Sequence, residues 1–417
     1  MEIFKFGGAS VKDAASVKNV LSVVKRTGEK SKVIVISAMG KITNAFEVVI
    51  SEYLKDPKRL PDSLAEIKSY HLEIANDLFS SEQAPVFKKM EAYFDEIKNF
   101  MKHNKSTKYD FVYDQLVCYG ELLSTTIVSE YFAQEGIKHT WLDSRTLIRT
   151  DNIYRDATVI WEETQNKITK KIDKEQLYIT QGFIAADTNN FTTSLGREGS
   201  DYTAAIFAYC LNADKVIIWK DVPGVLNADP RVFENPQLLH QISYEEAIEL
   251  AFYGASVIHP KTLQPLQRKE IPLFVKSFLD PSGDGTAVSK GQALIPAVPC
   301  FIVKKGQVLI SLSSLDFSFM VEENISEIFR LFHLYQIKVD LIQNSAISFA
   351  VCVDNKFNNL EKLIQHLKAR YKVSYVTGVS LYTIRHFDDG AITTLEKDKE
   401  VLLKQVMQNT VQIVTKS

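Results

Sequence analysis

Residues 1–10 read MEIFKFGGAS, a short apolar run with one cation, Lys5, that ends in Gly7 and Gly8. Two glycines directly after a strand let backbone N–H groups approach a ligand closely, and Lys5 adds a positive charge beside them. Taken alone, a motif this short is more often a surface turn with a solvated lysine. The rest of the chain therefore decides between a turn and a ligand-binding loop.

Strand and helix patterns alternate from this run onward. Runs typical of buried parallel strands lie at residues 32–39, 176–184, 215–222 and 271–278. Helical patterns lie at residues 14–25, 45–54, 64–79, 109–134, 202–211 and 244–253. This alternation predicts an α/β layered domain with a mostly parallel sheet over residues 1–285, and the charged segment 64–102 is expected to form a helical cap.

The residue composition changes near residues 280–289, where Gly, Pro, Ser and Asp indicate a linker. Beyond it the pattern is strand 307–314, helix 324–336, two adjacent strands, helix 358–370 and strand 373–380. That order, βαββαβ, predicts a ferredoxin-like α+β module over residues 300–380. Residues 381–417 partly repeat this pattern, with a strand at 381–387, a helix at 397–407 and a strand at 410–416.

Composition excludes several classes of protein. The net charge is −2 and 24% of the residues are charged, so neither nucleic acid nor a membrane is an expected partner. The four cysteines are scattered without metal-ligand spacing, which predicts reduced thiols and no bound metal among the protein side chains. No secretory signal or membrane-spanning run is present, and we predict a cytoplasmic protein.

Three further stretches contain candidate ligand-binding residues. TSLGREGSDYTAA (residues 193–205) places Arg197, Ser200 and Asp201 at the start of an apolar helix, whose N-terminus can bind an anion or need only a cap. WKDVPGVLNADPR (residues 219–231) ends a strand and turns. CYGELLSTTIV (residues 118–128) places Glu121 at the head of an apolar helix, where an acid is usually solvated.

These stretches together resemble the amino-acid kinase superfamily and, within it, the aspartate kinases. KFGGAS, VISAMGKITN, YGELLS, TQGFI, LGREGSDYTAA, KDVPGVLNADPR and SYEEAIELAFYGASVIHPKT follow the order of the family's motifs. The resemblance covers residues 1 to about 300, and the later module resembles an ACT regulatory domain. It implies an αβα-layered kinase domain followed by an ACT-like region, with L-aspartate and ATP as substrates and Mg²⁺ as cofactor.

The resemblance also implies roles for individual residues. The catalytic residues would be Lys5 and Asp201. The residues facing aspartate would be Ser37, Thr43, Glu121, Arg197, Ser200 and Asp201. The nucleotide contacts would be Lys5, Phe6, Gly7, Gly8, Lys220, Asp221, Leu226, Arg231 and Ser256.

This chemistry agrees with the residue types in the motifs. The side-chain carboxylate of aspartate, with a pKa near 4, is already ionised at neutral pH, so no general base is needed. The enzyme has to hold two anions together and neutralise the transferring phosphoryl group. Lysine and glycine-rich loops serve that purpose, and a Walker A motif is absent.

Two alternatives remain open at the level of sequence. One is another kinase of the superfamily, such as a glutamate-type kinase, and the other is an inactive amino-acid-sensing paralogue. Departures from the family's usual residues motivate the second: Ala9 for threonine, Glu198 for glycine, Lys220 for threonine, Leu226 for an aromatic and Ser256 for lysine. One hypothesis is that Lys220 replaces the cation missing at Ser256.

The ACT-like region leads to a prediction about control. We expect a homodimer formed through this region. The loop LIQNSAISF carries Ala346 where an acidic residue is frequent, and a desolvated ligand ammonium needs a charged partner. We therefore expect weak or absent inhibition by lysine or threonine.

Overall fold

The computed structural model describes residues 1–81, 83–255, 258–316, 318–356 and 358–416. It divides into two compact units, and each is formed by several segments of the chain. The first unit comprises Met1–Val225, Leu238–Ile248 and Val257–Leu294. The second comprises Leu226–Gln237, Glu249–Ser256 and Ile295–Ser417.

An eight-stranded sheet forms the centre of the first unit, in the order β3-β4-β2-β1-β7-β9-β10-β8. Its strands are β1 (Glu2–Phe6), β2 (Lys32–Ile36), β3 (Thr140–Leu142), β4 (Leu177–Gln181), β7 (Lys215–Lys220), β8 (Gln241–Ser243), β9 (Leu273–Ser277) and β10 (Thr286–Ser289). Every pairing from β3 to β9 is parallel, whereas β9 and β10 are antiparallel. The predicted mostly parallel sheet is confirmed.

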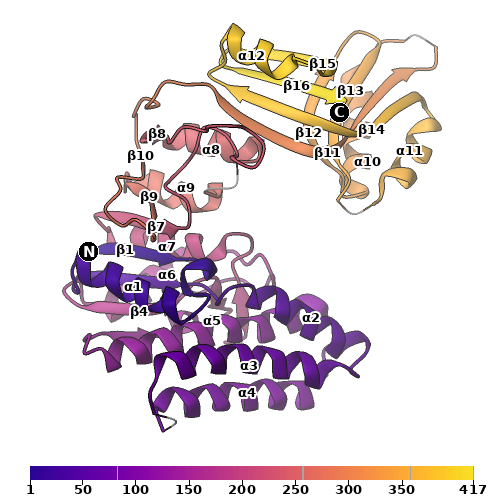
Figure 1. Cartoon of the computed structure of the whole chain (residues 1–417). Coiled ribbons are helices and arrows are strands. Elements are labelled where there is room, and N and C mark those ends of the chain that lie inside the picture. The colour runs from indigo at the N-terminus through magenta and orange to yellow at the C-terminus, as the bar shows by residue number, and fades with distance from the viewer. Residues whose placement is uncertain (82, 256–257, 317, 357, 417) are drawn as a thin grey trace. The chain divides into compact units, whose positions relative to one another are not determined.

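Helices cover both faces of this sheet. One face carries α1 (Ala14–Thr27), α2 (Ile42–Lys55), α3 (Leu60–Leu78), α4 (Pro85–His103) and α5 (Tyr109–Gln134), the last four being grouped on one side of the strands in Figure 1. The other face carries α7 (Gly199–Leu211), which packs against β1 and β7, with α6 (Trp161–Lys171) and α9 (Pro260–Lys269) beside it. The unit also contains two short 3₁₀ turns, a hairpin of β5 (Ile184–Ala186) and β6 (Thr192–Ser194), and the first half of α8 (Tyr244–Tyr253), whose residues from Glu249 onward belong to the second unit.

The side chains of β1 alternate between the two faces of the sheet, one packed in the core and the other facing α7. Phe4 and Phe6 are fully buried on the α1–α5 side, and Phe6 stacks on Trp219 of β7 with ring centroids 6.0 Å apart. Because successive side chains of a strand point to opposite faces, Lys5 points toward α7.

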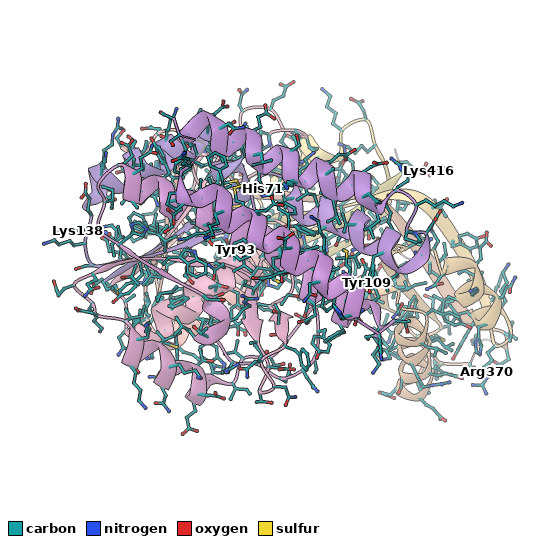
Figure 2. The ribbon with its side chains drawn as sticks, turned by 90° about the horizontal axis from the view of Figure 1, so that it is seen from below. His71, Tyr93, Tyr109, Lys138, Arg370 and Lys416 are labelled. Atoms are coloured by element: carbon teal, nitrogen blue, oxygen red, sulfur yellow. The ribbon has the colours of Figure 1, made fainter. Side chains whose placement is uncertain are left out.

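The predicted helical cap consists of α3 and α4. Figure 2 views the molecule onto these helices and labels His71 of α3 and Tyr93 of α4. His71 is fully buried, and burial lowers its pKa to about 4, so its ring is a neutral part of the packing. No helix among the described residues is long and apolar enough to cross a membrane.

The second unit contains a six-stranded antiparallel sheet in the order β12-β13-β11-β14-β16-β15. Its strands are β11 (Cys300–Ser314), β12 (Lys338–Asn344), β13 (Ser348–Asp354), β14 (Tyr371–Arg385), β15 (Glu400–Met407) and β16 (Thr410–Lys416). Its helices are α10 (Glu322–Leu334), α11 (Leu360–Lys368) and α12 (Asp389–Glu396). The strands β11 and β14, of 15 residues each, pair with one another along almost their whole length.

Two expectations about secondary structure are wrong. The predicted helix at 397–407 is the strand β15, which pairs with β16, and the helix lies earlier as α12. The predicted linker at 280–289 contains β10, which joins the large sheet. In both cases pairing with a neighbouring strand of the sheet overrides the local pattern.

The partial C-terminal repeat, residues 381–417, pairs with a strand that the sequence pattern did not predict. The first residues of β11, Cys300–Lys304, pair with Leu381–Arg385 of β14, which in turn pairs with β16. The first residues of the predicted 300–380 module thus supply an additional strand beside residues 381–417.

Candidate active site

The candidate site lies where the parallel strands of the first unit end. A cavity of about 610 Å³ opens there, and six of the predicted residues line it: Lys5, Ser37, Thr43, Glu121, Arg197 and Ser200. The carboxyl ends of parallel strands are the usual ligand position in open α/β sheets. The structure therefore brings together residues that are up to about 195 positions apart in sequence.

The loop after β1 is packed too closely for side chains. A Cβ atom on Gly8 would lie 2.7 Å from the carbonyl oxygen of Gly40 and 2.8 Å from that of Ala38. The Gly40 N–H also donates a hydrogen bond to the Gly8 carbonyl, at 3.0 Å. Gly7 is less confined, because its Cβ would meet only Lys5 Nζ, at 3.4 Å. The glycine pair is thus a close-approach loop, and Gly8 is its sterically required member.

Asp201 lies between two lysines. Its Oδ1 atom is 2.6 Å from Lys5 Nζ, and its Oδ2 atom is 3.7 Å from Lys220 Nζ. Lys5 is level with Ile218 in the parallel register of β1 and β7, so Lys5 and Lys220 project from the same face of the sheet, toward α7. Burial alone would raise the pKa of Asp201, but Lys5 and Lys220 outweigh it and lower that pKa. Asp201 is therefore an ionised carboxylate already neutralised by the protein.

Glu121, unlike Asp201, has no neighbouring lysine in the described part of the chain to offset the effect of burial on its pKa. It lies within α5, its side chain is buried, and its Oε2 atom has no hydrogen-bond partner among the described residues. Burial raises the pKa of Glu121 to about 8, so the free protein holds this group protonated at neutral pH. A buried acid without a charged partner that lines a cavity is suited to pairing with an incoming cation.

Two helix N-termini border the same cavity. Thr43 lies in the first turn of α2, and Ser200 lies in the first turn of α7. Unpaired N–H groups at such ends attract anions. Ser37 follows β2, and its carbonyl accepts a hydrogen bond from Ser124 Oγ of α5, at 2.7 Å, which fixes the loop against that helix.

Sequence reasoning missed several lining residues. Among them are Tyr113 and Arg155, whose guanidinium lies 4.5 Å from the Tyr113 ring centroid. Arg155 has φ +71°, and its N–H donates to Asp114 Oδ2 at 2.9 Å. No motif marks these residues, because the loop that contains Arg155 reaches the cavity only through tertiary folding. Asn44, Phe183 and Glu198 also line the cavity.

Several predicted residues are not among those that line this cavity. Four of them lie near it through the contacts described above: Gly7, Gly8, Asp201 and Lys220. Phe6 is fully buried in the core, and its carbonyl accepts a hydrogen bond from Ser37 N. Asp221 is exposed just after β7. Leu226 and Arg231 belong to the second unit, where Arg231 pairs with Asp229 at 2.7 Å. Ser256 lies outside the described residues.

The described residues contain no group of three or more His, Cys, Asp or Glu side chains placed to hold a metal ion. Among the residues described, two carboxyl groups lie near Lys5: Glu198, which lines the cavity, and Asp201, which pairs with Lys5. Carboxylate oxygens are the ligand type that Mg²⁺ accepts, and Mg²⁺ commonly takes only one or two of them together with substrate phosphates.

Comparison with known proteins gives a consistent result. Residues 1–277 match the amino acid kinase family. Lysine-sensitive aspartokinase 3 of Escherichia coli is 31% identical over 395 residues, covering 92% of this chain and 86% of that protein. Chloroplastic aspartokinase 1 of Arabidopsis thaliana is 30% identical over 367 residues, covering 84% of this chain but only 63% of that protein.

The similarity extends to three dimensions. The crystal structure of E. coli aspartokinase III in complex with aspartate and ADP superimposes with a TM-score of 0.82 at 27% identity. The match covers 100% of this chain and 96% of that chain.

Proposed function

The chain belongs to the amino acid kinase family and, within it, to the aspartokinases, and from this membership we propose that it phosphorylates the side-chain carboxylate of L-aspartate with ATP. The product is 4-phospho-L-aspartate, and the reaction is the first step of the aspartate-derived amino-acid pathway. One observation carries the proposal: a single cavity is lined by Lys5 and by the buried Glu121, whose Oε2 atom has no hydrogen-bond partner among the described residues. Such a cavity suits a substrate that is both a cation and an anion.

The geometry supports a different role for Asp201, which the sequence resemblance makes a catalytic residue that faces aspartate. Asp201 is already paired with Lys5, so we assign the substrate's α-ammonium to Glu121 rather than to Asp201. Arg197 offers its guanidinium to the α-carboxylate, because a planar fork binds a carboxylate in bidentate fashion. Asp201 is then a positioning residue, which holds Lys5 in place for the reacting anions.

No side chain has to remove a proton. The β-carboxylate of aspartate attacks the γ-phosphorus, the bond to the bridging oxygen breaks, and ADP leaves as an anion. Lys5, the N–H groups of Gly7 and Gly8, and the N-terminus of α7 would neutralise the charge on the transferring group. Mg²⁺, when bound with ATP, would neutralise phosphate oxygens.

A hydroxamate assay tests this function. The purified chain is incubated with ATP, Mg²⁺, hydroxylamine and either L-aspartate or L-glutamate, and the trapped acyl phosphate is measured. We expect product with aspartate and at least about tenfold less with glutamate, since one methylene displaces the nucleophile. Equal product from both acids would indicate a broader kinase, and no product from either would support a non-catalytic paralogue.

Further features of the proposal rest on the family resemblance. We propose a cytoplasmic homodimer that pairs through the ACT-like region, residues 300–380, with a partial second unit over residues 381–417. The nucleotide contacts Asp221, Leu226, Arg231 and Ser256 belong to the same proposal, as do lysine, threonine and methionine as end products. All four cysteines are free and buried, which is consistent with a reducing compartment.

A further inference from the structure

Arg155 has a backbone conformation that favours glycine. Its φ is +71°, in the left-handed region, and its side chain lines the cavity. Any side chain at such a φ is strained relative to glycine, because its Cβ atom crowds the backbone. The local backbone therefore gives no reason for an arginine here, and the reason has to lie in what its side chain reaches.

The backbone of Arg155 is anchored to the strand that leads to Arg197. The Arg155 N–H donates to Asp114 Oδ2 at 2.9 Å, and the fully buried Asp114 also accepts from the N–H and the hydroxyl of Ser194, at 2.9 and 2.6 Å. Ser194 ends β6, three residues before Arg197. A Cβ atom on the intervening Gly196 would lie 3.3 Å from the Arg155 carbonyl oxygen, so the two loops are in contact. Arg155 and Arg197 thus enter one cavity from two loops that are held together.

The guanidinium of Arg155 lies over two aromatic rings. It is 4.5 Å from the ring centroid of Tyr113 and 5.4 Å from that of Tyr109, which is labelled in Figure 2. The two tyrosines are four residues apart in α5 and therefore lie on the same face of that helix. A cation over a ring is held by the π electrons, so the N–H groups of the guanidinium remain able to donate to an anion.

The ion pair that Arg155 makes is a weak one. Its Nη1 atom is 3.5 Å from Asp110 Oδ1, and the two side chains are 43% and 62% exposed. Exposed ion pairs contribute little, because water screens both charges. Arg155 is therefore held by its backbone and by the two rings, and an anion in the cavity can replace Asp110.

The charges of the substrate indicate which group Arg155 can bind. Among the described residues that line the cavity, the cations are Lys5, Arg155 and Arg197. Lys5 belongs to the reacting end, where it pairs with Asp201, and Glu121 is assigned to the α-ammonium. The α-carboxylate is the remaining charge of aspartate, and its two oxygens can accept from two guanidinium groups.

We propose that Arg155 is a second substrate-binding arginine, which holds the α-carboxylate of aspartate together with Arg197. The inference rests on the proposed function, because its ligand is the aspartate of that reaction. Arg155 gives up Asp110 when the substrate enters and keeps its contacts with the two tyrosines. Its contribution is to binding and orientation, and it favours substrates that carry a charged α-carboxylate.

The first experiment compares two substrates that differ in one charge. L-Aspartate α-amide keeps the reacting β-carboxylate and the α-ammonium but has no charged α-carboxylate. The hydroxamate assay gives kcat/KM for both substrates in the wild type and in Arg155→Gly, whose backbone adopts φ +71° without strain. We expect Arg155→Gly to lower kcat/KM for aspartate by about tenfold or more, chiefly through KM, and to change that for the α-amide by less than about threefold.

The matched control is Ser31→Gly. Ser31 also has a left-handed backbone, with φ +56°, but it precedes β2, at the opposite end of that strand from Ser37. Its substitution should leave the kinetics with both substrates unchanged. Equal losses for aspartate and the α-amide in Arg155→Gly would mean that Arg155 acts only through the fold, and would overturn the proposal. Unchanged kinetics with aspartate would overturn it as well, whereas absence of product from the wild type would contradict the proposed function.

A second experiment measures binding without turnover and remains decisive if the chain is not a kinase. The unfolding temperature of each protein is measured with ADP alone and with ADP plus L-aspartate or its α-amide at equal concentration. Each shift is taken from the same protein's value with ADP alone, which removes any change in intrinsic stability. L-Aspartate should raise the unfolding temperature of the wild type and of Ser31→Gly more than that of Arg155→Gly. Equal shifts in the three proteins, or no shift in any of them, would overturn the proposal.

Discussion

Among the single residues of the site, Glu121 has a protonation state that depends on whether the cavity is filled. Burial raises its pKa to about 8, and its Oε2 atom lacks a partner among the described residues. An ammonium group placed beside it would favour the carboxylate form. Aspartate binding at neutral pH should therefore release a proton from this residue.

The Glu121 assignment predicts how aspartate affinity changes with pH. The Michaelis constant for aspartate should fall as pH rises from about 6 to 8, by up to about tenfold per unit, and then level off. Glu121→Gln should raise this constant by about ten- to a hundredfold and abolish its pH dependence, with the constant for ATP nearly unchanged. Steady-state kinetics at several pH values test this, and equal losses for both substrates would contradict the assignment.

The same residue makes a prediction for the free protein. The folded chain retains the Glu121 proton up to about pH 8, whereas the unfolded chain releases it near pH 4.5. Stability should therefore fall with rising pH between these values, by at most about 1.4 kcal/mol per unit. Thermal unfolding of Glu121→Gln should show a shallower dependence than the wild type, and an equal slope in both proteins would rule out a protonated Glu121.

Which residues form the site was partly predictable from sequence. Lys5, Arg197 and Asp201 lie in glycine-rich or helix-start motifs that indicate anion binding without any structure. The partner of Asp201 was not predictable, because the register of β1 and β7 decides that Lys5 and Lys220 share one face. Burial of Glu121 within α5 likewise depends on packing that no local pattern contains.

At the level of elements, the loop between β1 and α1 depends on one glycine more than on the other. The space beside Gly8 is filled by backbone atoms of the segment after β2, whereas Gly7 faces only the flexible end of Lys5. A side chain at Gly8 would push these two loops apart. The N–H groups of the loop would then lose their alignment.

This difference gives a paired mutational test. Gly8→Ala should weaken ADP binding by about tenfold or more, whereas Gly7→Ala should change it by less than about threefold. Calorimetry measures the affinity, and circular dichroism checks that both variants remain folded. Equal effects of the two substitutions would show that the loop does not act through close packing.

Elements with a strong sequence period were predictable, whereas β15, which is defined by its pairing in the sheet, was not. The patterns for β1, α5 and α8 gave their observed bounds. β15 was taken for a helix because its leucine and valine residues also fit a helical period. Its pairing with β16, close by in sequence, and the pairing of β16 with β14 make it a sheet edge.

At the level of the whole molecule, the second unit is expected to respond weakly to amino acids. Ala346 lies in the loop between β12 and β13, where its carbonyl accepts a hydrogen bond from Met320 N at 2.9 Å. An alanine offers no charge to a ligand's ammonium, so a bound amino acid would leave that group unpaired.

Inhibition assays test this directly. Lysine or threonine at about 1 mM should reduce activity by less than about twofold, while the lysine-sensitive E. coli aspartokinase 3 serves as the positive control for lysine. Ala346→Glu should increase sensitivity if the missing charge is the cause. Strong inhibition of the wild type at micromolar concentrations would refute the prediction.

The long strands β11 and β14 also impose an order on events during synthesis. The ribosome makes the segment Cys300–Lys304 before its partner Leu381–Arg385. The strand β16, which pairs with the same part of β14, is made last. At about 5–20 residues per second, the ribosome needs roughly 4–16 s to extend the chain from Lys304 to Arg385. Throughout that interval the nascent strand presents an unpaired edge, which the same segment of a neighbouring chain on the same messenger RNA can capture.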